Sequence, residues 1–438
     1  MIIKFGTDGI RGPVESKITP EVCLRIGHAA GVVLKEMGWE TVLIGKDTRV
    51  SGYMLESALQ AGFIAAGVNV RLLGPLPTPG VAYLTRSLRN QFGLVISASH
   101  NNYLDNGIKL FAGTGEKISK DAEKKIEKLL SGDLKPVKTA ELGKAQRFDE
   151  SGDRYIEFCK STVPPEVSFE SLRIVLDCAN GACYKVSPSI LRELGAEVIS
   201  IGTEPDGYNI NHECGSTYPE RAQEEVIKQR ADFGIALDGD GDRVVLIDRK
   251  GNILDGDDIM YILAYANPNR TGPWNGIVGT SMTNLGFEEG VKKLGYKFKR
   301  ADVGDKYVSQ MLQKEGWLLG GEPSGHIICR DLVSTGDGTI AALKVISSLL
   351  ILEKDPEDIL CNFTKMPQIN INVEVKNKDI LSDSDIQKKV KEIESDLTVG
   401  RVLVRPSGTE SKIRVMVESD DEITATKYAK DIAVMFKK

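Results

Sequence analysis

Three aspartates alternate with glycines in the segment Asp238-Gly-Asp240-Gly-Asp242, and this pattern favours a cation site. Glycine allows the backbone to turn tightly, so the three carboxylates can converge on one point. Carboxylates that lie so close repel one another unless a cation sits among them. Their hard oxygens select Mg²⁺, which takes few protein ligands and completes its shell with phosphate or water. The segment therefore predicts a magnesium site.

Two other interpretations fit this segment less well. A calcium loop of the D-x-D-x-D-G type needs glycine at its sixth position and glutamate at its twelfth, where this chain has Arg243 and Arg249. A solvated acidic turn is the simpler alternative. However, the preceding run Phe233-Gly-Ile-Ala-Leu237 is apolar enough to be a buried strand. A metal site remains the favoured interpretation.

The segment Ser97-Ala-Ser99-His100-Asn-Asn102 places hydroxyl groups beside an imidazole. A serine next to a histidine could suggest an acyl-transfer nucleophile, but no G-x-S-x-G sequence surrounds it. On its own, a turn or a helix cap would account for these residues. A serine that carries phosphate gains a charge of about −1.5 to −2 and needs a metal and cationic partners. The aspartate segment and the neighbouring Arg243 could supply both.

The segment Arg405-Pro-Ser-Gly-Thr-Glu-Ser411, followed by Arg414, combines hydroxyls, backbone N–H groups and two guanidinium groups. This composition suits phosphate, because arginine donates paired hydrogen bonds to it and successive N–H groups can cradle an anion. It is not a Walker loop, since the G-K-[ST] ending is absent. A plain hairpin turn with a solvated arginine is the alternative.

A further glycine-bounded segment, Gly321-Glu322-Pro-Ser324-Gly-His326, offers a carboxylate and a hydroxyl close together. These two groups suit neighbouring hydroxyls of a sugar. On its own this segment does not define a site.

The elements that must position these segments follow one layout three times. In each copy an apolar strand leads into a helix and a second strand, and the last strand ends directly before one of the polar segments. The strands expected in the three copies are 41–45, 68–73 and 92–96; 173–177, 197–201 and 233–237; and, in a shorter copy, 276–279 and 317–320. Strands that alternate with helices predict mainly parallel sheets covered on both faces. Because ligands of such sheets bind beyond the carboxyl ends of strands, the three segments are expected to share one cleft.

The end of the chain follows a different pattern. After residue 365 apolar and polar residues alternate, and then a charged helix and two strands at 401–404 and 413–417 follow. This predicts a small antiparallel sheet with helices on one face, in which residues 405–410 join two strands. The fold class is therefore α/β. We expect three similar mixed α/β domains at 1–150, 151–252 and 253–365, and a C-terminal α+β domain at 366–438.

Bulk composition excludes several classes of function. The formal net charge of −6 argues against a nucleic-acid partner, which requires a basic face. No segment approaches the roughly 18 uninterrupted apolar residues of a membrane span. The N-terminus lacks the basic and apolar regions of a signal peptide, so a cytoplasmic location is expected. The seven cysteines are scattered without a C-x-x-C pair, which favours reduced thiols over a zinc site or disulfides.

Together, the polar segments resemble the α-D-phosphohexomutase superfamily over essentially the whole chain. The segments that carry the resemblance are Phe5-Gly-Thr-Asp-Gly-Ile-Arg-Gly12, 97–109, 238–243, 321–326 and 405–410. The opening segment, the phrase S-A-S-H-N and the stretch Arg300-Ala-Asp-Val-Gly-Asp-Lys-Tyr-Val308 are most similar to the branch that acts on glucosamine phosphates.

The resemblance implies a heart-shaped enzyme with a central cleft and assigns a role to each matching residue. Ser99 would carry a phosphoryl group and, with Asp238, Asp240 and Asp242, would hold Mg²⁺. The residues implied to act near the reacting oxygens are Arg11, His100, Lys109, Arg243 and His326. The residues implied to bind substrate are Glu322 and Ser324, at sugar hydroxyls, and Arg405, Ser407, Gly408, Thr409 and Arg414, at the phosphate that does not react.

The reaction implied is the interconversion of glucosamine 6-phosphate and glucosamine 1-phosphate, which supplies amino-sugar nucleotide and cell-wall precursor synthesis. It would pass through the phosphoserine and a sugar 1,6-bisphosphate, which also acts as activator. The partner implied is a small phosphosugar, and the chain would be a monomer or a homodimer. The alternatives are a phosphomannomutase/phosphoglucomutase of the same superfamily and, less favoured, a sugar-phosphate phosphatase. Asn102, Pro323 and Ser411 depart from the superfamily's usual residues, and Pro323 lies in the segment expected to read the sugar.

Overall fold

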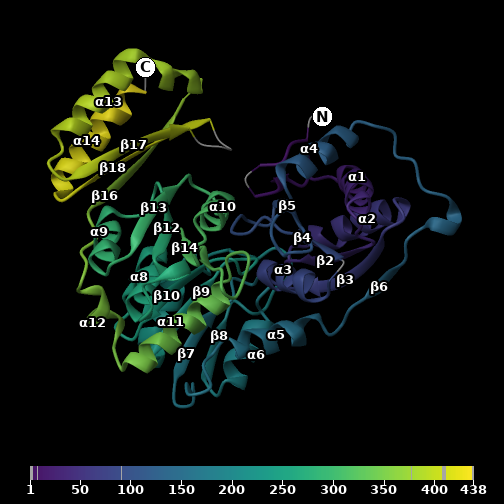
Figure 1. Cartoon of the computed structure of the whole chain (residues 1–438), viewed down its shortest axis with the longest axis horizontal. Helices are drawn as coiled ribbons and strands as arrows, with labels where there is room; N and C mark the ends of the chain where they lie inside the picture. Colours follow the sequence, from purple (N-terminus) through teal and green to yellow (C-terminus); the bar gives the residue numbers. More distant parts are fainter. Residues whose placement is uncertain (1–2, 7, 90, 376, 407–410, 437–438) are drawn as a thin grey trace.

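The computed structural model describes residues 3–6, 8–89, 91–375, 377–406 and 411–436, whose strands form four sheets. We call each sheet with its helices a unit and number the units along the chain. In Figure 1 the first unit lies on the right, the second at the bottom, the third on the left and the fourth above the third. The units therefore follow one another in an arc, with the first and the fourth at its two ends.

The first unit has a sheet of strand order β1-β5-β4-β2-β3-β6, covered on both faces. Alternate residues of one strand enter two different cores: Val42 and Ile44 pack with α1 and α2, whereas Leu43 packs with α3. Its elements are β1 (Ile10–Pro13), α1 (Pro20–Glu36), β2 (Thr41–Lys46), α2 (Ser51–Ala65), β3 (Asn69–Pro75), α3 (Thr78–Ser87), β4 (Gln91–Ile96), β5 (Asp105–Phe111), α4 (Lys120–Leu129), the short helix η1 (Thr139–Glu141) and β6 (Ala145–Arg147).

The second and third units repeat a shorter version of this layout, with strand orders β11-β10-β9-β7-β8 and β13-β12-β14-β15. The second unit contains α5 (Ser151–Ser161), β7 (Arg173–Asp177), α6 (Val186–Glu193), β8 (Glu197–Ile201), α7 (Glu220–Gln229), β9 (Phe233–Leu237), β10 (Val244–Asp248) and β11 (Ile253–Leu254). The third contains α8 (Gly256–Ala266), η2 (Gly272–Trp274), β12 (Gly276–Thr280), α9 (Leu285–Lys293), β13 (Lys297–Ala301), α10 (Asp305–Glu315), β14 (Leu319–Gly321), β15 (Ile327–Cys329), α11 (Gly338–Leu352) and α12 (Pro356–Leu360).

The strands before each polar segment pair in parallel, as predicted, and each polar segment is followed by a further strand that the sequence did not predict. The pairs β2–β4, β7–β9 and β12–β14 are parallel, as expected. The strand that follows each polar segment turns back and pairs antiparallel with the strand before it, giving β4–β5, β9–β10 and β14–β15. Each polar segment is therefore the connection of an antiparallel pair. The strand expected at 317–320 begins only at Leu319.

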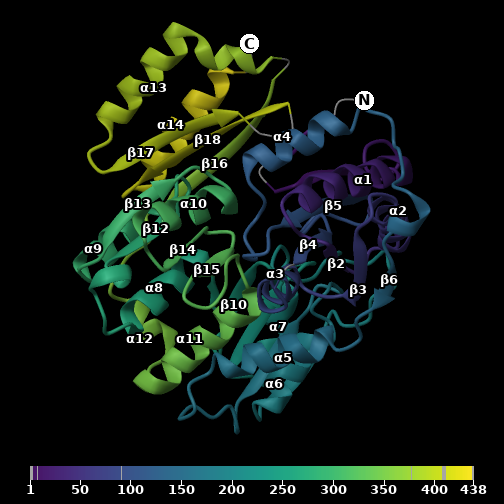
Figure 2. The same ribbon diagram turned by 45° about the vertical axis from the view of Figure 1, so that its right-hand side comes forward.

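The fourth unit is an antiparallel sheet of strand order β16-β18-β17, as the alternation predicts. Its elements are β16 (Gln368–Glu374), η3 (Lys378–Ser382), α13 (Ser384–Asp396), β17 (Gly400–Pro406), β18 (Lys412–Ser419) and α14 (Glu422–Met435). Val402, Val404, Val415 and Val417 pack in one core with residues of α14 on one face of the sheet. Figure 2 shows both long helices on this face. The alternate residues of the strands lie on the opposite face.

The remaining observations bear on the classes excluded above. Among the described residues, no helix is both long and apolar enough to cross a membrane. The apolar helix α11 is instead part of the largest core, together with α8. All seven cysteines are free thiols.

Candidate functional site

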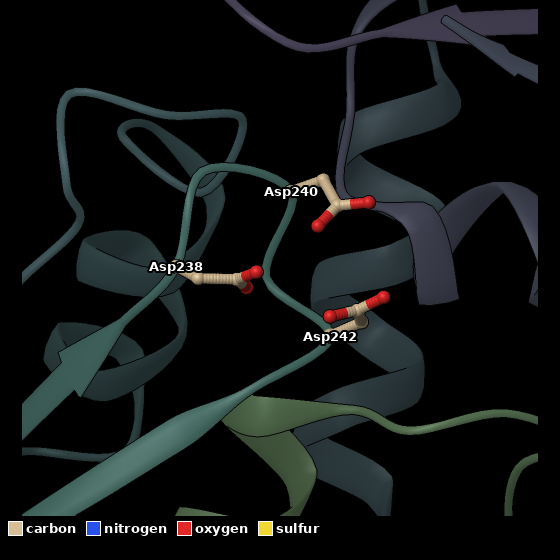
Figure 3. A group of neighbouring side chains, drawn as sticks. All are labelled: Asp238, Asp240 and Asp242. Atoms are coloured by element: carbon tan, nitrogen blue, oxygen red, sulfur yellow. The ribbon is translucent and has the colours of Figure 1, made fainter. Parts of the chain in front are cut away.

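The three aspartates lie on the β9–β10 connection and point toward one another, as Figure 3 shows. Each offers a carboxylate oxygen that lies within 4.8 Å of those of the other two, and all three side chains are buried. Asp240 Oδ1 and Asp242 Oδ1 are buried without a hydrogen-bond partner among the described residues. Orphaned oxygens of this kind are costly unless a cation binds them. The cluster therefore fits a metal ion with oxygen ligands.

Lys109 supplies the nearest positive charge to this cluster. It lies on β5, is 1 % exposed, and its Nζ donates to Asp240 Oδ2 at 2.8 Å and to Asp242 Oδ2 at 3.1 Å. Burial opposes a charged lysine, but Asp240 and Asp242 outweigh it and raise the pKa of Lys109 well above its ordinary value. Asp238 lacks such a partner. Burial and the two neighbouring carboxylates raise the pKa of Asp238 well above its ordinary value, so this carboxylate has the most to gain from a cation.

Ser99 faces the aspartates from the connection between β4 and β5. Its backbone has a left-handed φ of 52° and its side chain is buried. Its Oγ donates to Asp238 Oδ2 at 2.5 Å, and its N–H donates to Ser97 Oγ at 2.9 Å. The left-handed backbone is costly for a residue with a side chain, and here it places a hydroxyl directly against the acidic cluster.

His100 Nδ1 lies 3.4 Å from Ser99 Oγ. Burial, together with the positive charges of Arg243 and Arg11, lowers the pKa of His100 to about 4. The imidazole next to Ser99 is therefore neutral at neutral pH and keeps a lone pair for a proton.

Two residues that the sequence analysis did not single out hold the Ser99 segment in place. Arg49 is 0 % exposed, pairs with Asp47, and donates from Nη2 to the carbonyl oxygens of Ser99 at 3.2 Å and Asn101 at 2.6 Å. Asn211, from the second unit, donates to the same two carbonyl oxygens at 2.9 Å each. The segment is thus clamped from both the first and the second unit. A charged pair directly after the apolar strand β2 was the only sequence signal for Arg49.

Arg11 reaches the site through Asp8. Arg11 lies on β1 and forms an ion pair with Asp8, whose Oδ2 also lies 3.3 Å from Lys109 Nζ. Asp8 Oδ1 accepts from Lys117 Nζ at 2.5 Å. Burial would raise the pKa of Asp8, but Lys109, Lys117 and Arg11 hold it well below its ordinary value. A single carboxylate therefore orients three cations.

Lys117 continues this chain of charges into the third unit, where it pairs with Asp305 at the start of α10. Asp305 Oδ2 lies 3.9 Å from His326 Nε2, and His326 Nδ1 lies 3.7 Å from Asp242 Oδ1. The Gly336 N–H donates to Nε2 at 3.1 Å, so Nδ1 carries the proton that faces Asp242. Burial disfavours the imidazolium, but Asp242 raises the pKa of His326. Alternating charges thus link the first three units around the acidic cluster.

Arg243 is the first residue after the acidic cluster. Its backbone N–H donates to Asp238 Oδ1 at 3.2 Å, and its Nε lies 3.9 Å from Asp242 Oδ1. Although burial opposes the charge, Asp242, Asp238 and Glu322 raise the pKa of Arg243. Arg243 therefore remains positively charged where the acidic cluster meets the third unit.

The segment from Glu322 to His326 connects β14 and β15 and lies against the second unit. Glu322 is 7 % exposed and its Oε1 accepts from the Gly304 N–H at 2.9 Å, whereas Ser324 is exposed. Gly325 has a φ of +86°, and a Cβ there would lie 2.0 Å from the Val244 carbonyl oxygen. Only glycine lets the segment approach β10 this closely, which fixes Glu322 beside the acidic cluster.

Arg405 and Arg414 are directly opposite each other on β17 and β18. Burial, followed by the like charge of Arg414, lowers the pKa of Arg405, while Glu322 acts in the opposite direction. Both arginines line a cavity of about 190 Å³. Two facing guanidinium groups favour an anion between them. Ser407, Gly408 and Thr409, which were expected to join them, lie outside the described residues.

The predicted site residues therefore come together in two groups. The first, at the junction of the first three units, contains Ser99, His100, Arg11, Lys109, Asp238, Asp240, Asp242, Arg243, Glu322 and His326. The second is the Arg405–Arg414 pair on the fourth unit. Ser324 is in neither group, and among the predicted site residues that the structure describes it is the one whose side chain is exposed.

Four family models match the chain in succession. Three describe phosphoglucomutase/phosphomannomutase alpha/beta/alpha domains I, II and III, at residues 3–135, 153–251 and 255–366. The fourth describes the phosphoglucomutase/phosphomannomutase C-terminal domain, at residues 370–434.

Among curated relatives, the chain is 52 % identical over 435 residues to the phosphoglucosamine mutase of Cellvibrio japonicus, covering 98 % of this chain and 97 % of that protein. It is also 52 % identical over 439 residues to the phosphoglucosamine mutase of Chromobacterium violaceum, covering 99 % and 98 %.

Solved structures share the fold at lower identity. A phosphoglucomutase/phosphomannomutase family protein from Burkholderia thailandensis matches with a TM-score of 0.84 and 23 % identity, covering 100 % of this chain and 98 % of that one. The Aspergillus fumigatus N-acetylphosphoglucosamine mutase, solved with GlcNAc-6P and magnesium, matches with a TM-score of 0.72 and 18 % identity, covering 99 % and 95 %.

Proposed function

The chain belongs to the phosphoglucomutase/phosphomannomutase family, and from this premise we propose that it interconverts glucosamine 6-phosphate and glucosamine 1-phosphate through a phosphoryl group on Ser99. It is a phosphohexose mutase, an isomerase. The proposal that Ser99 holds the phosphoryl group rests on the 2.5 Å hydrogen bond from Ser99 Oγ to Asp238, whose cluster contains carboxylate oxygens without a hydrogen-bond partner.

We propose Mg²⁺ as the cation of this cluster, held by Asp238, Asp240 and Asp242 together with an oxygen of phosphorylated Ser99. All the donor atoms are hard oxygens, which favours Mg²⁺ over softer metals. When bound, the ion would offset negative charge on the phosphoryl group during transfer. The bisphosphorylated sugar described next is the second cofactor, since it also restores phosphate to Ser99 when that phosphate has been lost.

In the first half of the reaction, the free hydroxyl at carbon 1 of the sugar 6-phosphate attacks phosphorus on Ser99. The new O–P bond forms as the bond from phosphorus to Ser99 Oγ breaks, and the proton of the hydroxyl is given up as Oγ gains one. The products are a sugar 1,6-bisphosphate and free Ser99. In the second half Ser99 Oγ attacks the 6-phosphate, and the new bond from Oγ to phosphorus forms as the bond from phosphorus to O6 breaks. His100, neutral because its pKa is about 4, is placed to take the proton of Oγ as O6 gains one, and the sugar 1-phosphate leaves.

Fixed cations surround the place where the phosphoryl group passes. Lys109 and Arg243 are held charged by the aspartates, and Arg11 is oriented through Asp8. Because Lys109 is buried, Arg11 and Arg243 are partly buried and all three are already oriented, they can stabilise the charge of the transition state without rearranging. His326 accepts from the Gly336 N–H at Nε2 and is therefore neutral, and its Nδ1–H faces Asp242 as a further hydrogen-bond donor.

Between the two halves the bisphosphate must turn end for end while Ser99 stays in place. We propose that the phosphate that does not react is held in turn by Arg405 and Arg414, with Ser407, Gly408 and Thr409 completing the loop. Glu322 and Ser324 would contact the sugar hydroxyls. In this scheme residues 1–150 provide the phosphoserine, 151–252 the metal ligands, 253–365 the sugar contacts and 366–438 the phosphate grip.

The substrate is tested by comparing kcat/KM for glucosamine, glucose and mannose 6-phosphates. A site that pairs the ammonium at carbon 2 loses a charge-assisted hydrogen bond with glucose, which costs about 1.5–3 kcal/mol. We therefore expect the glucosamine phosphate to be preferred by about tenfold or more. Equal or faster conversion of glucose or mannose phosphate would reassign the substrate to the phosphomannomutase/phosphoglucomutase type. Release of inorganic phosphate in place of an isomeric phosphosugar would indicate a phosphatase.

A further inference from the structure

The hairpin formed by β17 and β18 has two charged ends on the same face of its sheet. At one end Arg405 faces Arg414, and at the other end Arg401 faces Glu418. Residues two apart on a strand share a face, so Arg401 and Arg405 point to the same side, away from the core that packs on α14. The first end holds the proposed phosphate-binding arginines. The second end has no role in the proposed reaction.

The Arg401 end is fastened to the third unit. Arg401 donates from Nη1 to the Ser281 carbonyl oxygen at 2.5 Å and from Nη2 to the Thr283 carbonyl oxygen at 2.6 Å. Its Nε donates to Glu418 Oε2 at 2.5 Å, and Glu418 Oε1 accepts from the Leu285 N–H at 2.8 Å. Glu418 is 0 % exposed. Both partners of this ion pair therefore bind residues 281–285.

Residues 281–285 are held just as firmly from their own side. Arg300 donates from Nη1 to the carbonyl oxygens of Thr280 at 3.0 Å and Thr283 at 2.5 Å, so Thr283 accepts from two guanidinium groups. Asn284 donates its N–H to buried Asp257 at 2.8 Å. The fourth unit is thus anchored to a rigid point of the third unit and not to a mobile surface loop.

This anchor adjoins both groups of site residues. Residues 281–285 follow β12, and Glu322 follows β14, which pairs parallel with β12, so both leave the same edge of the sheet. Met282 lines the 190 Å³ cavity together with Arg405 and Arg414. The anchor therefore fixes how far the phosphate-binding arginines lie from the sugar-binding carboxylate.

We propose that Arg401 and Glu418 are positioning residues for the mutase reaction, which pin the base of the β17–β18 hairpin so that Arg405 and Arg414 hold the bisphosphate while it turns. The inference rests on the proposed function. It predicts that weakening the anchor loosens the grip on phosphate without impairing transfer from Ser99.

The first test compares Arg401→Met and Arg401→Lys with the wild type. We expect Met to raise KM for the sugar 6-phosphate about tenfold and to increase the bisphosphate released into solution per turnover. Single-turnover transfer from phosphorylated Ser99 at saturating substrate should stay within about threefold of the wild type. Lys keeps the charge but cannot reach both carbonyl oxygens, so its effect should be intermediate. The control is Lys389→Gln, which removes an exposed ion pair with Glu392 on α13 and should change nothing.

A second measurement separates positioning from simple loss of folding. Hydrogen exchange at the Leu285 amide, which donates to Glu418, should accelerate in Arg401→Met, while the β18 amides of residues 413–417 stay protected. Equal acceleration in both places, or a lower rate of transfer with unchanged KM and no extra bisphosphate, would overturn the inference. Exchange is measured without substrate, so it decides the matter even if the wild type converts no hexose phosphate. A wild type that converts no hexose phosphate would refute the proposed function and not this inference.

Discussion

The strands that carry the acidic cluster and those that carry the phosphate-binding arginines differ in how they are packed. Every residue of β9 and β10 is buried. The loop between these strands accepts hydrogen bonds from residues of the first and third units. No residue of β17 is fully buried; its face away from the helices meets the third unit mainly through Arg401. The chemical centre is therefore built into three units, whereas the grip, by which we mean Arg405 and Arg414, belongs to the fourth unit alone, which meets residues 281–285 of the third unit through Arg401, Glu418 and Gln368.

This difference fits the demands of a mutase. Phosphoryl transfer needs donors and cations that are oriented before the reaction, because their reorganisation would raise the barrier. The grip must accept phosphate at either end of the sugar, so it needs donors that fit any phosphate and contributes to binding more than to transfer. Mutations at the centre should therefore lower kcat, and mutations at the grip should mainly raise KM.

The sharpest way to break the centre is Asp240→Asn, which keeps the shape of the side chain but removes one carboxylate from the cluster. We expect kcat to fall about hundredfold to thousandfold and the Mg²⁺ concentration needed for activity to rise. Magnesium titration of activity after treatment with a chelator measures both. Asp153→Asn, at an exposed position of α5, is the control. Wild-type activity after exhaustive metal removal would contradict the metal assignment.

The next largest effect should come from Arg49→Lys. Lysine can still pair with Asp47, but it cannot donate to the carbonyl oxygens of Ser99 and Asn101 at once. Because a small misplacement of the reacting group is expensive, kcat should fall about hundredfold while KM changes little. Steady-state kinetics measures this split. A change in KM with kcat intact would mean that Arg49 acts on substrate binding instead.

At the grip, Arg405→Lys should give the opposite pattern. A point charge replaces a bidentate donor, so KM should rise about tenfold with a smaller change in kcat. The matched control is Arg192→Lys, at an exposed position near the end of α6. If kcat fell as far as in Arg49→Lys, the division into centre and grip would be wrong.

The smallest expected effect is a change in stability and not in activity, at a buried carboxyl group that takes no part in the proposed reaction. Asp337 caps α11 and accepts from Tyr155 Oη at 2.8 Å, and burial raises its pKa to about 6. The folded state therefore binds this proton more tightly than the unfolded state, and the stability it confers is lost as pH rises from about 4 to 6. Asp337→Asn cannot ionise. The melting temperature of the variant relative to the wild type should therefore rise by several degrees over this pH range, and the difference should stay constant at higher pH. A constant difference at every pH would show that Asp337 does not titrate there.

The sequence predicted the centre well because its chemistry is concentrated in short segments that each follow an apolar strand. Residue types and spacing pointed to Asp238, Asp240 and Asp242, whereas the role of Ser99 came from the resemblance to the superfamily. The clamp could not, because Arg49 and Asn211 reach the Ser99 carbonyl oxygen from 50 and 112 residues away. Neither residue carries a pattern that reveals such a contact.

The docking of the units was equally invisible in the sequence. The bridge from Asp8 through Lys117 to Asp305 spans 109 and 188 residues, and Arg401 meets Ser281 across 120. Lys117, Asp305 and Arg401 are ordinary charged residues until the units come together. The antiparallel return of β10 and β15 was missed because a wholly buried return strand is as apolar as a parallel one. The return strand β5 was missed because Asp105, Asn106 and Lys109 interrupt its apolar residues.

The most direct test of the account is a single turnover of protein phosphorylated on Ser99 with a stoichiometric amount of glucosamine 6-phosphate. Intact mass and peptide mapping follow the phosphate on the protein, and chromatography follows the sugars. We predict that Ser99 loses its phosphate as glucosamine 1,6-bisphosphate forms, that Ser99 then regains phosphate as the 1-phosphate appears, and that Ser99→Ala does neither. Conversion by Ser99→Ala at the wild-type rate, or release of inorganic phosphate in place of the bisphosphate, would contradict the account.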